Sequence, residues 1–460
     1  MRQAFSAILI IICGLGYLGS QGCRALDVYG AFERRPKDDA GQAMHTAASE
    51  GPARSSAGGA ASSNTAMAAA GTAKQASAPI NARHLATVAD AAVQQELARG
   101  LFCVRAEGAA VCEPAHTVAF GHAVCSCGDI LGAGVLSTNS SRSTGRADVG
   151  ADGSVSLRIG RGGVMGEEPG LIDGSLVVAG LGPATISASD ARIRGDLSLY
   201  GELTFAGNVH VMGSVYARRL PRGTGALQID GDLHHAADRF PATPSLGVQV
   251  AGRVIEGEYV ARPACPCDTS NIVALASAIV TAEQRADPGL ARLDREAMSN
   301  LTAASSFELS CGQYYLRQIS SLSSVIWRVT GHVVVFVGGD LVVASDLTVM
   351  LEEGAQLDLL VGGNLLVGGS ARFADAERAA ASRVYVVGGV ELASGALPRG
   401  QLSADSVIVG NLYAPSATLQ LARPSELYGS VFVRQLLIHQ SLLVHYDPAV
   451  TRELGASCYE

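Results

Sequence analysis

The sequence predicts an all-β protein that winds into a parallel β-solenoid, and the plainest evidence is a run of four six-residue units. They begin at Gly195, Gly201, Gly207 and Gly213 and read GDLSLY, GELTFA, GNVHVM and GSVYAR. Apolar and polar residues alternate within each unit, which is the pattern of a strand with one buried face. The evenly spaced glycines predict corners where the backbone takes a positive φ. Short strands joined by regular corners wind into a solenoid.

Glycine-led copies return in the second half of the chain at a longer spacing. Gly339 is followed by DLVV and Gly363 by NLLV, and both glycines are predicted turn positions. Gly410 and Gly429 lead two further copies at a slightly shorter interval. These spacings fit one turn of a three-sided β-helix better than a hairpin, which needs a two-residue turn between paired strands.

The composition excludes several classes of function. The 460 residues are 48% hydrophobic, 17% charged and 5% aromatic, with 54 glycines and a net charge of −8. The acidic balance provides no basic footprint for nucleic acid. The only lysines are Lys37 and Lys74, so enzymes that need a catalytic or phosphate-binding lysine beyond residue 74 are excluded.

The amino terminus reads as an export signal. Arg2 precedes an apolar run from Ala4 to Leu18, which is short for a membrane-spanning helix. Gly22-Cys23 resembles the end of a lipoprotein cleavage box, so residues 1–23 are predicted to be a signal peptide with Cys23 as the lipidation site. Ordinary cleavage nearby and an uncleaved anchor are the alternatives. Residues 24–83, rich in Ala, Ser and Gly, are predicted to form a disordered tether.

The rest of the chain divides by composition and period. Residues 84–130 are expected to be a cysteine-rich N-terminal cap, residues 131–263 and 311–450 two β-solenoid segments, and residues 451–460 a tail. Residues 264–310 are a helical insertion expected to pack on a flank of the solenoid. Leu275, Ala276 and Ile279 lie on one helical face, with Thr269 or Ser270 as the N-cap. A second helix is expected near Leu290 to Ala303.

Eight cysteines beyond the leader are disulfide candidates, because an even number in an exported chain favours disulfides. They are Cys103, Cys112, Cys125, Cys127, Cys265, Cys267, Cys311 and Cys458. We expect Cys103 to bond Cys112 locally and Cys458 to hold the tail. The two Cys-x-Cys pairs provide four thiols that zinc also accepts, but zinc sites usually space their cysteines more widely. We therefore expect no metal and no cofactor.

Two histidine motifs are better explained by structural roles than by catalysis or metal binding. His445, Tyr446 and Asp447 are consecutive, and neighbouring strand residues point to opposite faces, so His445 and Tyr446 do not converge on one substrate atom. We expect this motif to cap the last coil. His234 and His235 form a pair in a loop, which we do not expect to bind a metal.

Three aspartates are the candidate catalytic residues if the protein is an enzyme. Asp340, Asp346 and Asp358 lie near strand ends, and β-helix enzymes that act on acidic polysaccharides use paired carboxylates. Asp340 directly follows two glycines, which suits hydrogen bonding within a turn. Trp327, the single tryptophan, has apolar neighbours and is expected in the core.

Several motifs together resemble a known family. They are PACPCD at Pro263, CGQYYL at Cys311, FVGGDL at Phe336, LDLLVGGNL at Leu357, NLYAP at Asn411, LYGSVFV at Leu427 and VHYD at Val444. This set, over about residues 120–450, resembles a β-solenoid domain of unknown function found in myxobacterial surface lipoproteins and pilus-assembly-associated proteins. The resemblance implies a right-handed parallel β-helix in an extracytoplasmic setting and carries no activity.

The sequence thus favours a non-enzymatic structural or adhesive solenoid, displayed on a tether at the outer membrane or cell surface. The expected partners are the membrane, through the N-terminal lipid or anchor, and matrix, polysaccharide or other copies of the chain, with no nucleic acid. A polysaccharide-active β-helix enzyme and a pilus- or secretion-associated accessory protein are the alternatives.

Overall fold

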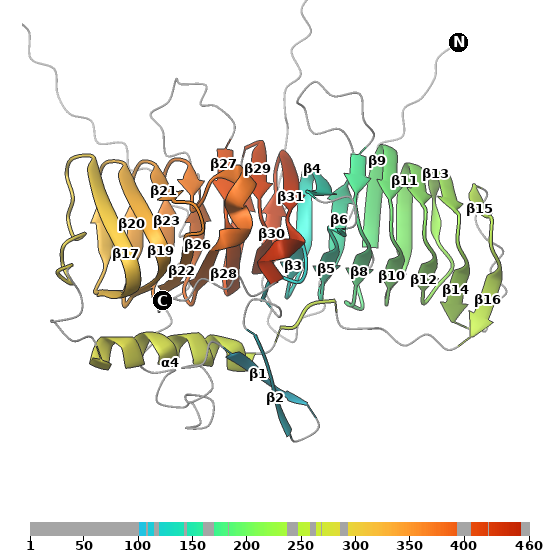
Figure 1. Cartoon of the computed structure of the whole chain (residues 1–460). Coiled ribbons are helices and arrows are strands. Elements are labelled where there is room, and N and C mark those ends of the chain that lie inside the picture. Colours follow the sequence, from blue (N-terminus) through green and yellow to red (C-terminus); the bar gives the residue numbers. More distant parts are fainter. Residues whose placement is uncertain are drawn as a thin grey trace, which may run out of the picture. The chain divides into compact units, whose positions relative to one another are not determined.

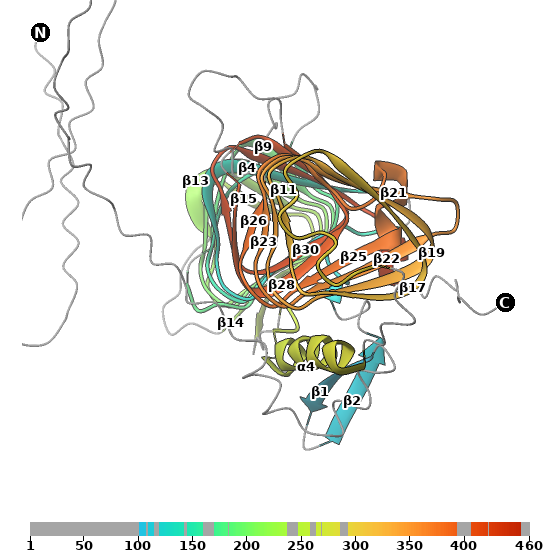
Figure 2. The ribbon, with the colours of Figure 1, turned by 90° about the vertical axis from the view of Figure 1, so that its left-hand side faces the viewer.

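A computed structural model of the chain describes residues 101–106, 109–114, 119–141, 145–159, 170–182, 184–236, 247–257, 264–267, 269–285, 293–392, 406–421 and 423–451. Most of these residues form a parallel β-solenoid of about 12 turns (Figures 1 and 2). The prediction of an all-β solenoid is confirmed. The predicted signal peptide, Cys23 and the tether lie outside the described residues.

Two segments of the chain build the solenoid. The first holds β3 (Val124–Ser126), β4 (Ile130–Ser140), β5 (Val149–Ala151), β6 (Val155–Arg158), β7 (Gly170–Ile172), β8 (Leu176–Val178), β9 (Ala184–Ile193), β10 (Leu197–Leu199), β11 (Leu203–Val211), β12 (Val215–Ala217), β13 (Arg222–Ile229), β14 (Leu233–Ala236), β15 (Val248–Val250) and β16 (Val254–Gly257). The second holds β17 (Ser305–Leu316), β18 (Ile319–Ser321), β19 (Val325–Val337), β20 (Leu341–Val343), β21 (Leu347–Leu351), β22 (Gln356–Val361), β23 (Leu365–Val367), β24 (Ala371–Arg372), β25 (Ser382–Val386), β26 (Val390–Leu392), β27 (Ser406–Val409), β28 (Asn411–Leu421), β29 (Ser425–Tyr428), β30 (Val431–Ile438) and β31 (Ser441–Tyr446), with the 3-10 helices η1 (Ala376–Ala381) and η2 (Pro448–Thr451).

Three six-residue units make one complete turn. Leu197 of the first unit pairs in parallel with Val215 of the fourth, so the fourth unit lies beside the first. The Gly213 N–H donates to the carbonyl of Gly195 at 3.2 Å. In the second segment Leu341 pairs with Leu365, which makes the interval between Gly339 and Gly363 one turn, as predicted.

The alternating apolar residues stack into columns inside the solenoid. Leu176, Leu197, Val215 and Leu233 occupy the same place on successive turns, and each is 0% exposed. Trp327 is also 0% exposed, which confirms its predicted place in the core. Full burial of one such aliphatic side chain contributes about 1.5–3 kcal/mol, so the columns are the main source of stability.

The segments stack in the reverse of their sequence order. β3, the first solenoid strand in the chain, pairs on one side with β30 and on the other with β5. β4 likewise pairs with β31, the last strand of the chain. Figure 1 shows these late and early strands side by side in the middle of the solenoid. The chain therefore enters mid-solenoid, winds to one end at β16, crosses to the other end at β17 and winds back.

Helix α4 (Thr269–Arg285) belongs to the connection between the segments. It contacts β19 and β22 of the second segment and the hairpin strand β1 (Leu101–Ala106), which pairs antiparallel with β2 (Ala109–Pro114). Figure 2 shows α4 between the solenoid and this hairpin. Within the insertion predicted over residues 264–310, the first expected helix is present as Thr269–Arg285, and it packs on a flank of the solenoid.

The second expected helix, near Leu290 to Ala303, is wrong where the structure describes it, from residue 293 onward. These residues form turns, and Leu301 makes a parallel bridge to Ser321. The Ser320 N–H donates to the carbonyl of Met298 at 2.9 Å. This stretch forms local turns, in which the Ala297 N–H donates to the carbonyl of Asp294 at 2.9 Å, and it also bonds to one face of the solenoid.

The expected caps are also placed differently. Within residues 84–130, β3 begins at Val124 and lies between two other turns, so this part is internal to the solenoid. The hairpin β1–β2 contacts α4, not a solenoid end. The His445 motif ends the last coil in sequence but pairs with β4 in space, with His445 opposite Asn139. Where the structure describes them, neither of these two segments lies at an end of the solenoid.

Close packing of neighbouring turns, not a left-handed backbone, explains most of the turn glycines. Of the six predicted positions only Gly207 has a positive φ, of 84°. A Cβ added to Gly213 would lie 2.6 Å from the carbonyl oxygen of Gly195, and one added to Gly363 would lie 2.6 Å from the carbonyl carbon of Gly339. The expectation of positive φ was wrong at the other five positions, and at Gly213 and Gly363 glycine is required because the neighbouring turn lies too close for a Cβ.

We expect Gly213→Ala to lower the free energy of unfolding by about 1–3 kcal/mol, the usual cost of overpacking. The matched control is Gly257→Ala, because no atom lies within 4 Å of the added Cβ. That control should change stability by less than about 0.5 kcal/mol. Urea denaturation followed by circular dichroism measures both. Equal effects of the two changes would contradict the packing explanation.

Candidate functional site

Two parallel disulfides lock the connection between the segments onto the middle of the solenoid. Cys125 bonds Cys265 and Cys127 bonds Cys267, with Cα–Cα distances of 5.9 and 5.5 Å. The two Cys-x-Cys pairs therefore do come together, as the zinc alternative required, but as disulfides. We call these four cysteines, with Asp152, the junction clamp.

Asp152 holds the same connection by hydrogen bonds. Its Oδ1 accepts the backbone N–H groups of Ala264 and Cys265 at 3.1 and 3.2 Å. Burial raises the pKa of the Asp152 carboxyl, although these two hydrogen bonds act in the opposite direction. Gly150 on β5 provides the space, because a Cβ there would lie 2.7 Å from the carbonyl oxygen of Ala264. The connection thus lies directly against the solenoid.

The remaining cysteine predictions stay open. Cys103 and Cys112 lie directly opposite each other in the backbone register of β1 and β2. Cys311 is disulfide-bonded. Cys458 lies outside the described residues. The local Cys103–Cys112 bond and the tail bond of Cys458 therefore remain predictions.

Aromatic side chains line the same junction. The ring of Phe120, which precedes β3, lies 5.5 Å from Tyr385 and 6.5 Å from Tyr413 between centroids. Tyr413 lies 4.7 Å from Phe432. The Tyr446 hydroxyl donates to the carbonyl of Phe120 at 2.8 Å, and burial raises the pKa of that phenol. The start of the first segment is therefore packed against the second segment by side chains as well as by strands.

The histidine motifs do not assemble a catalytic group. Tyr446 is 2% exposed, whereas His445 stacks on Tyr428 with ring centroids 4.4 Å apart. His234 and His235 lie on strand β14 and not in a loop as expected, and His234 stacks on Tyr216 with ring centroids 4.6 Å apart. Among the described residues no group of three or more His, Cys, Asp or Glu side chains is arranged to hold a metal ion.

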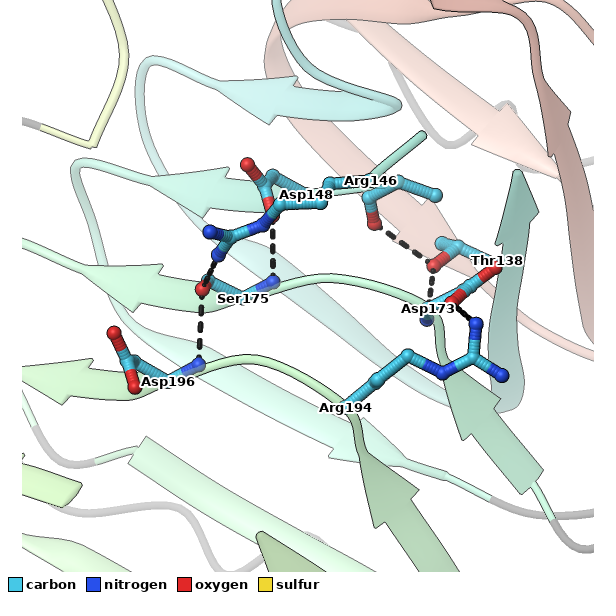
Figure 3. A network of polar contacts seen from close by, with 8 residues as sticks. Thr138, Arg146, Asp148, Asp173, Ser175, Arg194 and Asp196 are labelled. Atoms are coloured by element: carbon cyan, nitrogen blue, oxygen red, sulfur yellow. Dashed lines mark hydrogen bonds and ion pairs between the residues drawn. The ribbon is translucent and has the colours of Figure 1, made fainter. Parts of the chain in front are cut away.

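A ladder of polar side chains joins successive turns along one corner of the first segment. The Ser175 N–H donates to Asp148 Oδ1 at 2.6 Å, and the Asp196 N–H donates to Ser175 Oγ at 3.0 Å. The same pattern continues through Ser214 and Asp232, with distances of 2.8 and 3.1 Å. Figure 3 shows the first part of this corner ladder. Each side chain satisfies a backbone donor that the corner would otherwise leave unpaired.

A second polar group in Figure 3 lies on the turn next to the junction. Thr138, which is fully buried, donates to the carbonyl of Ala147 at 3.0 Å and accepts the Asp173 N–H at 3.2 Å. Asp173 accepts the Ser140 N–H at 3.0 Å and forms an ion pair with Arg194. These bonds join β4, β7 and the corner after β9.

Asp340 and Asp346 form the same corner contacts in the second segment. Asp340 Oδ1 accepts the Asn364 N–H at 2.7 Å, and Asp346 Oδ1 accepts the Ser370 N–H at 2.8 Å. Asp340 was expected to form hydrogen bonds within its own turn, but its partner Asn364 lies on the next coil, 24 residues along the chain. These two carboxylates lie at different corners of a turn, before β20 and before β21, so they do not form a pair across a substrate.

Asp358 lies instead on the face of β22, in a buried ionic group. Arg383 Nε lies 2.7 Å from Asp358 Oδ1, and His332 Nε2 donates to Asp358 Oδ2 at 2.8 Å. The side chains of Arg383 and Asp358 are only 9% and 17% exposed. Burial alone would raise the pKa of Asp358, but the Arg383 charge and the His332 hydrogen bond keep that pKa below its usual value.

The described core holds an apolar cavity of about 10 Å³, lined by Ile408, Leu412, Leu419, Leu421, Leu427, Val431 and Leu442. This volume is close to that of one water molecule, and its lining is entirely apolar. None of the helices in the described part of the chain is long and apolar enough to cross a membrane.

Comparison with known proteins finds one family. Residues 271–453 match the family described as Domain of unknown function (DUF7305). No curated protein and no solved structure matches the chain. The match begins inside α4 and ends just after β31, so it takes in the second segment and most of the helix. The resemblance seen in the sequence is thereby supported over this part, as a β-solenoid domain of unknown function.

The sequence analysis missed the junction clamp and the corner ladder, although both leave a signal. Two Cys-x-Cys pairs of equal internal spacing, 140 residues apart, suit two parallel bonds between aligned strands. In the ladder, a Ser or Asp directly follows the corner glycine at Gly174, Gly195, Gly213 and Gly231. Asp152 has no such signal, because its partners are backbone groups far along the chain.

We expect Asp358→Asn to destabilise the fold by about 3 kcal/mol at neutral pH, because it leaves the buried Arg383 without its counterion. The depressed pKa of Asp358 means that its contribution is present above about pH 4 and is lost as the pH falls through the folded-state value. The difference in the free energy of unfolding between wild type and Asp358→Asn, measured by urea denaturation, should therefore become smaller below about pH 4.

Asp230→Asn is the control, since Asp230 pairs with His210 at an exposed site. It should cost less than about 1 kcal/mol. A gap for Asp358→Asn that persists undiminished at the most acidic pH where the protein stays folded would show that the ion pair is not the cause.

Proposed function

We propose that this chain is a non-enzymatic structural or adhesive protein of the cell surface, a β-solenoid displayed on an N-terminal membrane tether. The observation that carries the proposal is how the candidate catalytic carboxylates are used. Asp340 and Asp346 each bind a backbone N–H of the next turn, and Asp358 neutralises Arg383. Carboxylates held in this way stabilise the coil and are poorly placed to exchange protons with a substrate.

The proposed location is outside the cytoplasm, at the outer membrane or cell surface, with Cys23 carrying the lipid and residues 24–83 serving as the tether. Disulfides support this location, because they persist in oxidising compartments. The clamp has two of them. The myxobacterial lipoprotein setting and the right-handed winding follow from the resemblance and belong to the same proposal.

A row of hydroxyl groups on one face suits a polysaccharide partner. Ser156 pairs with Thr185 on the next turn, and Thr185 pairs with Thr204 on the turn after that. Ser156 and Thr204 are exposed and Thr185 is half-buried. Neighbouring turns lie about 4.8 Å apart. The row therefore presents regularly spaced donors and acceptors to the hydroxyl groups of a matrix polysaccharide.

We expect the purified chain to bind an extracellular polysaccharide without releasing products. The double change Thr185→Ala and Thr204→Ala should weaken retention on immobilised polysaccharide severalfold. The matched control, Thr302→Ala with Ser306→Ala, removes two exposed hydroxyl groups at the far end of the solenoid and should leave binding unchanged. Assays of retained protein and of released reducing ends give both readouts.

The competing outcome is polysaccharide cleavage that stops in Asp340→Asn. This change removes the carboxylate and keeps the fold, because Asn364 already makes the equivalent bond to the Gly389 N–H at 2.8 Å. Product release by wild type and its loss in Asp340→Asn would overturn the non-enzymatic proposal.

A further inference from the structure

The row of hydroxyl groups on the first segment continues into an arginine. Ser156, Thr185 and Thr204 follow one register position along β6, β9 and β11, strands that lie on successive turns (Figure 1). On the next turn, β13 places the exposed Arg222 beside Thr204 at that same position. Arg158 is also exposed and lies two residues after Ser156, so it shares the outer face of β6. This face therefore carries hydroxyl groups between two arginines.

Two further arginines lie at the corner where this face begins. Arg219 and Arg222 both approach Glu202, at 3.6 and 3.5 Å, and the guanidinium carbon of Arg218 lies 5.4 Å from the ring centre of Tyr200. Within the described ranges, Glu202 is the one carboxylate that forms an ion pair with any of these three arginines. We call Arg218, Arg219 and Arg222 the arginine corner. It keeps an excess of positive charge, although the whole chain has a net charge of −8.

The arginine corner is accessible to an incoming anion. The side chains of Arg219 and Arg222 are 60% and 67% exposed. Their distances to Glu202 exceed the ~2.7–2.9 Å of a close charge-assisted hydrogen bond. An exposed ion pair of this kind stabilises the fold little, so an external anion can replace Glu202 at small cost. The planar guanidinium fork suits the two oxygens of a carboxylate and also binds tetrahedral oxyanions.

The dimensions of the face suit an extended polymer better than a single sugar. Neighbouring turns lie about 4.8 Å apart, so the three steps from Ser156 to Arg222 span about 14 Å. A chain of sugars lying along the row reaches the hydroxyl groups and the arginine corner together. Such a chain needs hydroxyl groups for the row and anionic groups for the corner.

We propose that this face binds an acidic polysaccharide, whose carboxylate or sulfate groups contact the arginine corner while its hydroxyl groups contact the row. This inference rests on the proposed function and adds the class of polysaccharide. An anionic membrane surface is the other partner that exposed arginines suit. The polysaccharide is favoured because the arginines lie in register with a row of hydrogen-bonding side chains.

Retention of the purified chain on two matched pairs of immobilised polymers tests the proposal. Polygalacturonate is compared with its methyl ester, and dextran sulfate with dextran, so each pair differs in charge on one backbone. Wild type should be retained severalfold more strongly by the acidic member of at least one pair, and the pair concerned distinguishes carboxylate from sulfate. Added NaCl should reduce this preference, because salt screens exposed charges.

Variants of the corner should shift the preference in opposite directions. Arg219→Gln with Arg222→Gln should reduce the preference for the acidic polymer severalfold. Glu202→Gln should increase it, because it removes the carboxylate that competes for both arginines, and a fold defect does not produce such a gain. Arg317→Gln is the matched control, since Arg317 is 72% exposed and pairs with Glu296 at 3.2 Å in the second segment. It should retain the wild-type preference.

Three results would overturn the inference. Equal retention on the acidic and neutral members of both pairs would remove the charge preference but leave polysaccharide binding, and so the proposed function, intact. Retention on none of the four polymers would contradict both. Binding to phosphatidylglycerol vesicles that is lost in Arg219→Gln with Arg222→Gln, without a preference for acidic polymers, would assign the arginine corner to a membrane surface.

Discussion

Backbone pairing between β3 and β30 is the interaction on which the rest of the molecule depends. The Val431 N–H donates to the carbonyl of Ala123 at 3.0 Å, and the Cys127 N–H donates to the carbonyl of Val433 at 2.9 Å. These bonds join the first and nearly the last solenoid strands of the sequence and make one continuous core from two segments. The crossing connection, its disulfides and the seat of α4 all follow from this docking.

Stacking at the spacing of a parallel sheet imposes the second constraint. Neighbouring turns lie so close that corners tolerate no Cβ at Gly195 or Gly213, and each corner leaves backbone donors facing the next turn. The Asp and Ser side chains of the corner ladder accept those donors. Asp340 and Asp346 do the same in the second segment. These carboxylates therefore bind the backbone of the next turn and stabilise the solenoid.

Local periodicity was enough to predict the strands, the turn length and helix α4, because each depends on residues close in sequence. The order of the segments was not predictable, since no local signal says that Val124 pairs with Val431 and not with a neighbour along the chain. The expected caps failed for this reason: each segment's sequence end was taken for an end in space. The junction clamp could be predicted only in part. Its cysteines are recognisable in the sequence, whereas nothing in the sequence marks Asp152 as their neighbour.

Hydrogen exchange at three amides measures the junction most directly. The N–H groups of Cys127, Val431 and Leu436 bond across it, to Val433, Ala123 and Asp129. If the segments form one solenoid, these amides should be protected as strongly as interior strands such as β10. Exchange at the rate of exposed loops, with β10 still protected, would show that the two segments fold as separate solenoids and would contradict the account.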